Sequence, residues 1–167
     1  MENIFLLLLL SVSFTLQAQN HVAKDSTFEQ LRTLIESGNF RIEVNRAYPS
    51  GGRSVDLFSN RGFVNVKDSV ATGFFPFFGR AYSAPLNGEG GIEFNAPMKK
   101  ITLTVKNKKK NKRILYHFQV KGTNDTYDIY VDASASGSCM VSVRSNQKSH
   151  ISYSGDIFPF PEKSSKP

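Results

Sequence analysis

Residues 40–45 read Phe-Arg-Ile-Glu-Val-Asn, and this short stretch decides the fold class. Its apolar side chains Phe40, Ile42 and Val44 alternate with polar ones, which is the two-residue period of a β-strand with one buried face. Immediately upstream, over residues 26–37, apolar residues recur at the spacing of a helix. The sequence therefore predicts one short helix followed by β-structure.

The predicted helix has recognisable signals at both ends. Ser26 and Glu29 form a capping-box pair, and Gly38 is suited to end the helix. No other segment combines helical spacing with such end signals, so we expect this to be the helix of the fold. Its apolar residues are Phe28, Leu31, Leu34 and Ile35.

The alternating pattern continues almost to the C-terminus, interrupted by short turn signals rich in Gly, Ser and Asn. Connections this short join antiparallel neighbours, because a parallel crossover needs a dozen or more residues. About ten short strands with one helix predict a mainly β fold, either a single antiparallel β-barrel or a barrel-like sandwich. We favour the barrel, because closure removes exposed strand edges. The further predicted strands cover residues 54–58, 63–66, 70–75, 91–94, 101–105, 113–120, 127–133, 138–143 and 150–153.

The N-terminus reads as a secretory signal peptide over residues 1–18. An unbroken apolar run over residues 4–10 leads to Ala18, where a small residue precedes a polar stretch. The alternative is an N-terminal buried helix. The run is shorter than the roughly 20 apolar residues of a membrane span. We therefore expect a periplasmic or secreted protein with no transmembrane segment in its mature form.

Cleavage after Ala18 would remove Glu2 as the sole charged side chain of the segment, so the formal charge of +7 would rise by one. The remaining length suits one domain. We expect a linker over residues 19–25, a single β-rich domain over 26–158 with its helix at 26–37, and a flexible tail over 159–167 that is rich in Pro, Ser and Lys.

The single cysteine, Cys139, excludes an internal disulfide. A lone thiol in an oxidising compartment is buried, reactive or paired with another chain. Because Cys139 lies in an alternating stretch, residues 138–143, we expect a buried side chain rather than a reactive thiol.

Four blocks of sequence resemble one family. They are Arg-Ala-Tyr-Pro-Ser-Gly-Gly-Arg-Ser-Val at 46–55, Phe-Phe-Gly-Arg-Ala-Tyr-Ser-Ala-Pro at 77–85, Gly-Gly-Ile-Glu-Phe at 90–94, and Val-Lys-Gly-Thr-Asn-Asp-Thr-Tyr-Asp at 120–128. Together they resemble the domain of unknown function 4251, a family of uncharacterised exported proteins of Bacteroidota. The similarity extends from about Phe28 to Tyr153. It implies an exported protein of that Gram-negative lineage, and it implies no activity and no catalytic residue.

Residues 106–113 read Lys-Asn-Lys-Lys-Lys-Asn-Lys-Arg. Such a run can bind a polyanion or an anionic envelope surface by releasing counterions. We favour a solvated long hairpin loop instead, since the run carries no interleaved aromatic platform, and we expect no nucleic-acid partner. The candidate anion patch consists of Lys108, Lys109, Lys110, Lys112 and Arg113.

The best candidates for ligand or partner contact are aromatic and arginine side chains near glycine-rich turns. Rings in the stretch Phe-Phe-Pro-Phe-Phe at 74–78 must point to both faces of an extended chain, so they form core and edge packing or line an apolar cavity or partner surface. Arginine forks and tyrosine hydroxyls at loop ends grip a carboxylate or phosphate, or alternatively stack on rings and cap loop carbonyls. The candidate set is Arg46, Tyr48, Arg53, Phe74, Phe75, Phe77, Phe78, Arg80 and Tyr82.

Patterns for known chemistry are absent from the sequence. The histidines His21, His117 and His150 are scattered without the spacing of a zinc site, and no nucleophile elbow, P-loop or dinucleotide fingerprint occurs. We expect no cofactor, no metal and no catalytic residue that can be named. The sequence favours a non-enzymatic binding module for an apolar or amphipathic ligand or a protein partner. An envelope-interaction protein with a basic hairpin, or an enzyme of unknown reaction, remains as the alternative.

Overall fold

A computed structural model describes residues 27–82, 91–108, 111–123 and 125–160 of the chain. Residues 27–36 form a helix, and ten strands follow it. The predicted signal peptide, the linker over 19–25, Ser26 and most of the predicted tail lie outside the described residues. The strands are β1 (Asn39–Pro49), β2 (Val55–Asp56), β3 (Gly62–Lys67), β4 (Val70–Pro76), β5 (Gly91–Pro97), β6 (Lys99–Lys108), β7 (Asn111–Lys121), β8 (Thr126–Ser134), β9 (Ser138–Arg144) and β10 (Ile151–Pro159).

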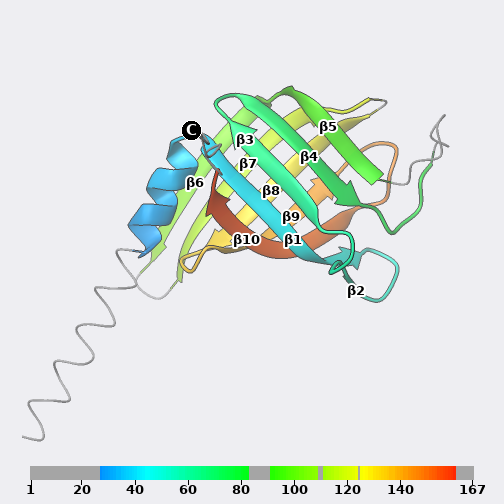
Figure 1. The fold of residues 1–167 in the computed structure, drawn as a ribbon, viewed down its shortest axis with the longest axis horizontal. Coiled ribbons are helices and arrows are strands. Elements are labelled where there is room, and N and C mark those ends of the chain that lie inside the picture. Colours follow the sequence, from blue (N-terminus) through cyan, green and yellow to red (C-terminus); the bar gives the residue numbers. More distant parts are fainter. Residues whose placement is uncertain (1–26, 83–90, 109–110, 124, 161–167) are drawn as a thin grey trace, which may run out of the picture.

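The strands form one antiparallel sheet in the order β5-β4-β3-β1-β10-β9-β8-β7-β6, with the short β2 paired to β1. The sheet curls into a half-barrel (Figure 1). Its two end strands, β5 and β6, are consecutive in the chain, and a bridge between Phe94 and Gly122 brings β5 to the end of β7. The predicted mainly β, barrel-like antiparallel fold with one helix is confirmed.

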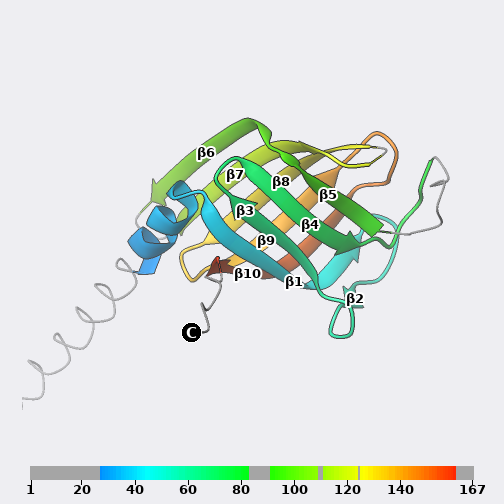
Figure 2. The ribbon, with the colours of Figure 1, turned by 45° about the horizontal axis from the view of Figure 1, so that its top comes forward.

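The inner face of the curled sheet forms the core. One side of each of β1, β3, β4, β5, β7, β8, β9 and β10 is buried, in the alternation that the sequence predicts. Phe75 and Tyr153 are completely buried and stack with ring centroids 4.8 Å apart. The helix covers one end of the half-barrel with the buried residues Phe28, Leu31 and Ile35 (Figures 1 and 2).

Strands β1 and β10 are longer than their predicted counterparts. Their ladder runs from Phe40 opposite Pro159 to Pro49 opposite Ile151, with a register shift between Val44 and Arg46. Gly155 interrupts the alternation of apolar residues in the sequence of β10, because it occupies a buried position but has no apolar side chain. A glycine is required there, since a Cβ atom would overlap the carbonyl oxygen of Glu43 on β1.

The basic segment over residues 106–113 is not the long hairpin loop that we expected. Strand β6 continues to Lys108 and β7 begins at Asn111, with Lys106 paired to Arg113. The prediction failed because charged side chains on strands open to solvent lose little hydration, so pairing extends beyond the point where the apolar pattern ends.

Among the residues that the structure describes, no helix is long and apolar enough to cross a membrane.

Candidate functional site

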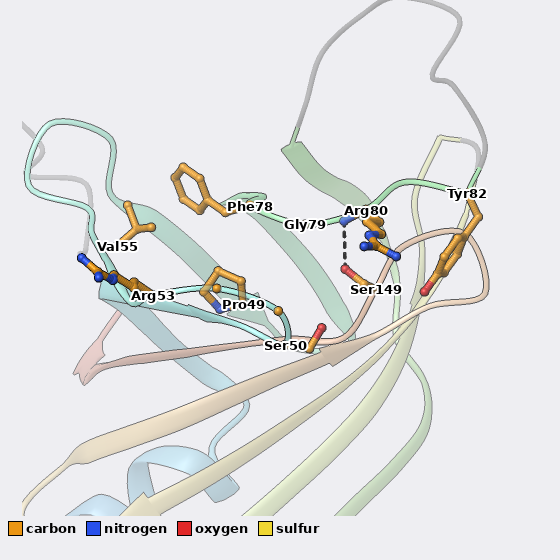
Figure 3. A pocket seen from close by; sticks show the side chains of 11 residues that line it. Pro49, Ser50, Arg53, Val55, Phe78, Gly79, Arg80, Tyr82 and Ser149 are labelled. Atoms are coloured by element: carbon orange, nitrogen blue, oxygen red, sulfur yellow. Dashed lines mark hydrogen bonds between the residues drawn. The ribbon is translucent and has the colours of Figure 1, made fainter.

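A hollow of about 600 Å³ lies between the loop that joins β1 to β2 and the segment that follows β4 (Figure 3). Its lining combines apolar, hydroxyl and guanidinium groups. It consists of Pro49, Ser50, Gly51, Gly52, Arg53, Val55, Phe78, Gly79, Arg80, Tyr82 and Ser149.

Backbone pairing holds one wall of the hollow in place. Ser149 donates its backbone N–H to the carbonyl oxygen of Arg80 (2.9 Å), and its Oγ accepts a hydrogen bond from the N–H of Arg80 (3.1 Å). The N–H of Tyr82 donates to the carbonyl oxygen of Gln147 (2.8 Å). At Gly79 a Cβ atom would overlap Ser149 Oγ, so the glycine permits this close approach. The segment after β4 is therefore fixed to the turn before β10.

A buried hydrogen bond supports the start of the same wall. The hydroxyl of Tyr153, on β10, donates to the carbonyl oxygen of Pro76 at 2.9 Å, where β4 ends. Burial raises the pKa of Tyr153, so the hydroxyl keeps its proton and remains a donor. Beyond Pro76, which has no N–H to donate, the chain leaves the ladder and Phe78 turns towards the hollow (Figure 3).

The opposite wall is the loop that leaves β1. Ala47 pairs with Val55, so the chain between them folds back as a short turn over Ser50, Gly51 and Gly52. An added Cβ atom at either glycine would meet nothing within 4 Å. These glycines leave backbone groups open towards the hollow, where a ligand can approach them.

The two arginines that line the hollow, Arg53 and Arg80, differ in their partners from the other arginines in the described part of the chain. Arg32, Arg41, Arg46, Arg61 and Arg113 each lie within 4.0 Å of a carboxylate, and Arg144 lies over the ring of Tyr130. Arg53 and Arg80 have no such partner among the described residues. They lie towards opposite ends of the hollow, with Phe78 between them in the view of Figure 3. None of the described residues that line the hollow is Asp or Glu.

The structure brings together four members of the predicted ligand set, namely Arg53, Phe78, Arg80 and Tyr82. It also adds lining residues that the sequence did not indicate. Ser149 lies about seventy positions away in the chain from Arg80, a separation that no local pattern reveals. Pro49, Ser50 and Val55 belong to the block over residues 46–55 that resembles the family, but their side chains carry no charge or aromatic ring that would mark them as ligand-binding residues.

The remaining predicted residues lie elsewhere. Arg46 pairs with Asp56 at 3.4 Å, and the hydroxyl of Tyr48 lies 3.4 Å from Ser154 Oγ, so both are engaged outside the hollow. Phe75 belongs to the core. Phe74 is half-buried on the other face of β4, and Phe77 packs against the core with Lys148 Nζ 5.9 Å from its ring centroid.

The structure describes three residues of the predicted anion patch, and their surroundings differ. Arg113 is paired with Asp132 at 2.8 Å. Lys112 Nζ lies 5.4 Å from the ring centroid of Phe28 in the helix, while Lys108 is exposed on β6. Lys109 and Lys110 lie outside the described residues.

Three polar side chains that the sequence did not single out, Thr102, His117 and Asp128, lie in a row across the outer face of the sheet. Thr102 Oγ1 lies 3.3 Å from His117 Nδ1, and His117 Nε2 lies 3.2 Å from Asp128 Oδ1. In a hydrolase triad the hydroxyl meets Nε2 and a buried carboxylate meets Nδ1. Here the two ring nitrogens have the opposite partners, and the groups are only partly buried. These three side chains therefore form hydrogen bonds between neighbouring strands, and they do not resemble a catalytic triad. Within the described ranges, no group of three or more His, Cys, Asp or Glu side chains is arranged to hold a metal ion.

Cys139 is buried on the inner face of β9, as predicted. Burial, assisted by the charge of Asp156, raises the pKa of its thiol to about 12. The thiol therefore stays protonated in the folded protein at pH values where an exposed cysteine ionises.

We expect the native protein to react with an aromatic disulfide reagent at about pH 8–9 at least a hundredfold more slowly than the urea-unfolded chain, since only the thiolate attacks. The release of the coloured thiol measures both rates. Comparable rates for the folded and unfolded protein would contradict the burial of Cys139.

Residues 22–157 match the family model described as Domain of unknown function (DUF4251). Among solved structures, the chain is similar to a DUF4251 family protein from Bacteroides eggerthii, with a TM-score of 0.61 and 18% sequence identity, over 83% of this chain and 91% of that one. At this identity the likeness shows the fold alone. The search of the curated proteins found no match.

Proposed function

Since the chain belongs to the DUF4251 family, whose defining domain has no known function, we propose a function from the hollow itself: the protein binds a small amphipathic anion there. The ligand would carry a carboxylate or phosphate on an apolar body. The observation that carries this proposal is the pair of arginines, Arg53 and Arg80, that lack an acidic partner among the described residues and share one hollow.

The charges support an anionic ligand. Each guanidinium presents a planar fork of donors that matches a carboxylate or phosphate. A hydrogen bond to a charged group contributes about 1.5–3 kcal/mol, which is roughly tenfold or more in affinity. Tyr82 and Ser149 add hydroxyl groups on the same side as Arg80 (Figure 3).

The apolar lining supports an amphipathic ligand over a bare inorganic ion. Pro49 and Phe78 lie between the two arginines in the view of Figure 3, and Val55 lies beside Arg53. Covering apolar surface contributes about 25 cal/mol per Å² removed from water. Since Phe78 is still 37% exposed without a ligand, an aliphatic or aromatic body has surface to cover.

We further infer that this binding takes place outside the cytoplasm, after cleavage behind Ala18. The apolar run at the N-terminus and the Ala18-Gln19 junction support export. The role would be that of a non-enzymatic binding module in the periplasm or outside the cell. Mass analysis of the N-terminus of the exported protein tests this point, and a retained residue 1 would refute it.

Substituting both arginines tests the binding site. We expect Arg53→Gln/Arg80→Gln to weaken binding of octanoate or phenyl phosphate at least about tenfold, because charge-assisted hydrogen bonds are lost. Isothermal titration calorimetry measures the change. Native mass spectrometry of the purified protein looks for a retained anion beforehand.

The matched control is Arg46→Gln, an arginine of the same sequence block that is engaged by Asp56 outside the hollow. Its affinity should stay within about twofold of the unaltered protein, because exposed ion pairs contribute little. Octanol and benzyl alcohol, which have apolar bodies but no charge, should bind much more weakly than the anions. Equal binding of neutral and anionic compounds, or an equal effect of Arg46→Gln, would refute the proposal.

A further inference from the structure

Strand β6 is an edge strand with an unusual degree of exposure. It is the last strand in the order of the sheet, and it pairs with β7 on one side. Of its ten residues, Val105 is half-buried and the others are exposed. A strand this long with open backbone groups is a template for another strand. Figure 2 shows β6 at the margin of the curled sheet.

The backbone turns β6 away from the strand that precedes it. Lys100 has a φ of 51°, in the left-handed region, and the register with β7 shifts between Lys99 and Thr102. For a residue other than glycine this conformation is energetically unfavourable. The bend directs β5 along β4 and β6 along β7, so the outer edge of β6 is left without a neighbouring strand among the described residues.

The side chains of β6 leave an apolar strip beside that edge. Leu103 lies opposite the buried Tyr116, so the odd-numbered residues from Ile101 to Val105 share the inner face of the sheet. Even so, Ile101 is 45% exposed and Leu103 is 37% exposed. The outer face of the same stretch carries Thr102 and Thr104, which favour extended structure. An added strand with alternating apolar and polar residues would continue both faces.

Lysines mark both ends of the strand. Lys99 and Lys100 lie at its start, and Lys106 and Lys108 lie towards its end. In the described part of the chain, none of the four is in an ion pair. Opposite charges facing each other across a strand pair stabilise it and like charges destabilise it.

We propose that the edge of β6 accepts an extended acidic segment of another protein as an additional strand, with acidic residues near both of its ends and apolar residues at its centre. A second copy of this chain fits poorly. Pairing of two β6 strands would place the lysines of both copies close together, and their like charges would repel each other. A bare polyanion would use the lysines but leave Ile101 and Leu103 uncovered. The acidic peptide satisfies the charges, the apolar strip and the open backbone together.

The probe is a capped, dye-labelled peptide of about nine residues, a common strand length, with alternating Val and Thr at its centre and Glu pairs at its ends. We expect saturable binding by fluorescence anisotropy and slowed amide exchange within Lys99–Lys108. The same peptide with Lys in place of Glu, or with a central Pro, should not bind. Raising the salt concentration should weaken the interaction.

Lys106→Glu/Lys108→Glu should weaken binding of the acidic peptide at least about tenfold, because attraction at one end becomes repulsion. Arg61→Glu/Lys148→Glu makes the same change in net charge in the loops before β3 and before β10, and it should leave the affinity within about twofold. Leu103→Thr should weaken binding a few-fold, since apolar contact with the centre of the peptide is lost.

Three results would overturn the proposal. The first is equal binding of the acidic and basic peptides. The second is protection of β6 amides by inorganic polyphosphate but not by the peptide. The third is a dimer of the peptide-free protein, detected by light scattering, whose interface protects the β6 amides. A failure here leaves the arginine hollow untouched, since the two sites share no residue.

Discussion

Replacing Phe75 by alanine is expected to lower the free energy of unfolding by about 3–5 kcal/mol, the range for removing a buried aromatic side chain. Phe75 is completely buried on β4. Its ring stacks on Tyr153 at 4.8 Å between centroids, with 16° between the planes, and lies 6.2 Å from the ring of Phe94. Alanine would leave a cavity between three strands that distant parts of the chain contribute.

Urea denaturation followed by circular dichroism measures this change. The matched control is Phe74→Ala, which removes the same ring one position earlier, from the other face of the same strand. Phe74 is half-buried, so its loss should cost about 1–2 kcal/mol, less than burial of a full ring. Equal losses for the two variants would mean that β4 does not present Phe75 to the core.

The second large effect is expected at Gly155. Gly155→Ala should destabilise the protein by about 3 kcal/mol, at the upper end of the range for overpacking a core. The new Cβ atom would overlap the carbonyl oxygen of Glu43 and lie 2.8 Å from the Cα atom of Val44. These are backbone atoms of β1, and a side-chain rotation cannot relieve the contact. The ladder between β1 and β10 would have to separate next to its register shift.

Gly52→Ala is the control for this prediction. A Cβ atom at Gly52 meets nothing within 4 Å, so the substitution should change stability by less than about 0.5 kcal/mol. The midpoint of thermal unfolding for the two variants gives the comparison. A Gly155→Ala protein as stable as Gly52→Ala would show that β1 and β10 do not approach as closely as described.

These two predictions concern the scaffold of the proposed binding site as well as the stability of the domain. Tyr153, on which Phe75 stacks, donates the hydrogen bond to Pro76 from which the segment with Phe78 and Arg80 departs. Loss of the stack should therefore loosen one wall of the hollow. We expect Phe75→Ala to weaken anion binding although Phe75 does not line the hollow.

The predicted strands all have counterparts in the structure, and the helix over residues 27–36 lies within the predicted range. Agreement is best where one face is buried, as at Phe40, Ile42 and Val44, because burial imposes the two-residue alternation that the sequence displays. It is poorest at strand ends. Gly155 interrupts the apolar pattern without ending β10, and the lysines of β6 conceal the continuation of that strand to Lys108.

For the site, the sequence indicated residue types better than positions. It selected Arg53, Phe78, Arg80 and Tyr82, which line the hollow, together with Arg46 and Tyr48, which do not. The tripeptide Arg-Ala-Tyr occurs at both 46–48 and 80–82, so local sequence had no means of separating the two. The difference arises because the first copy lies within β1, where Arg46 meets Asp56, while the second lies beyond the end of β4.

The sequence by itself determined the class of fold, the short helix over residues 27–36, the alternation that buries one face of most strands, and the burial of Cys139. These features follow from local periodicity and from the transfer of apolar side chains out of water, and both act along the chain. Only the tertiary structure decided that β1 pairs with β10, that the sheet curls until β5 meets the end of β7, that Ser149 meets Arg80, and that two arginines without an acidic partner among the described residues share one hollow. Those outcomes depend on which distant strands become neighbours, and pairing between strands so far apart leaves no periodic signal in either of them.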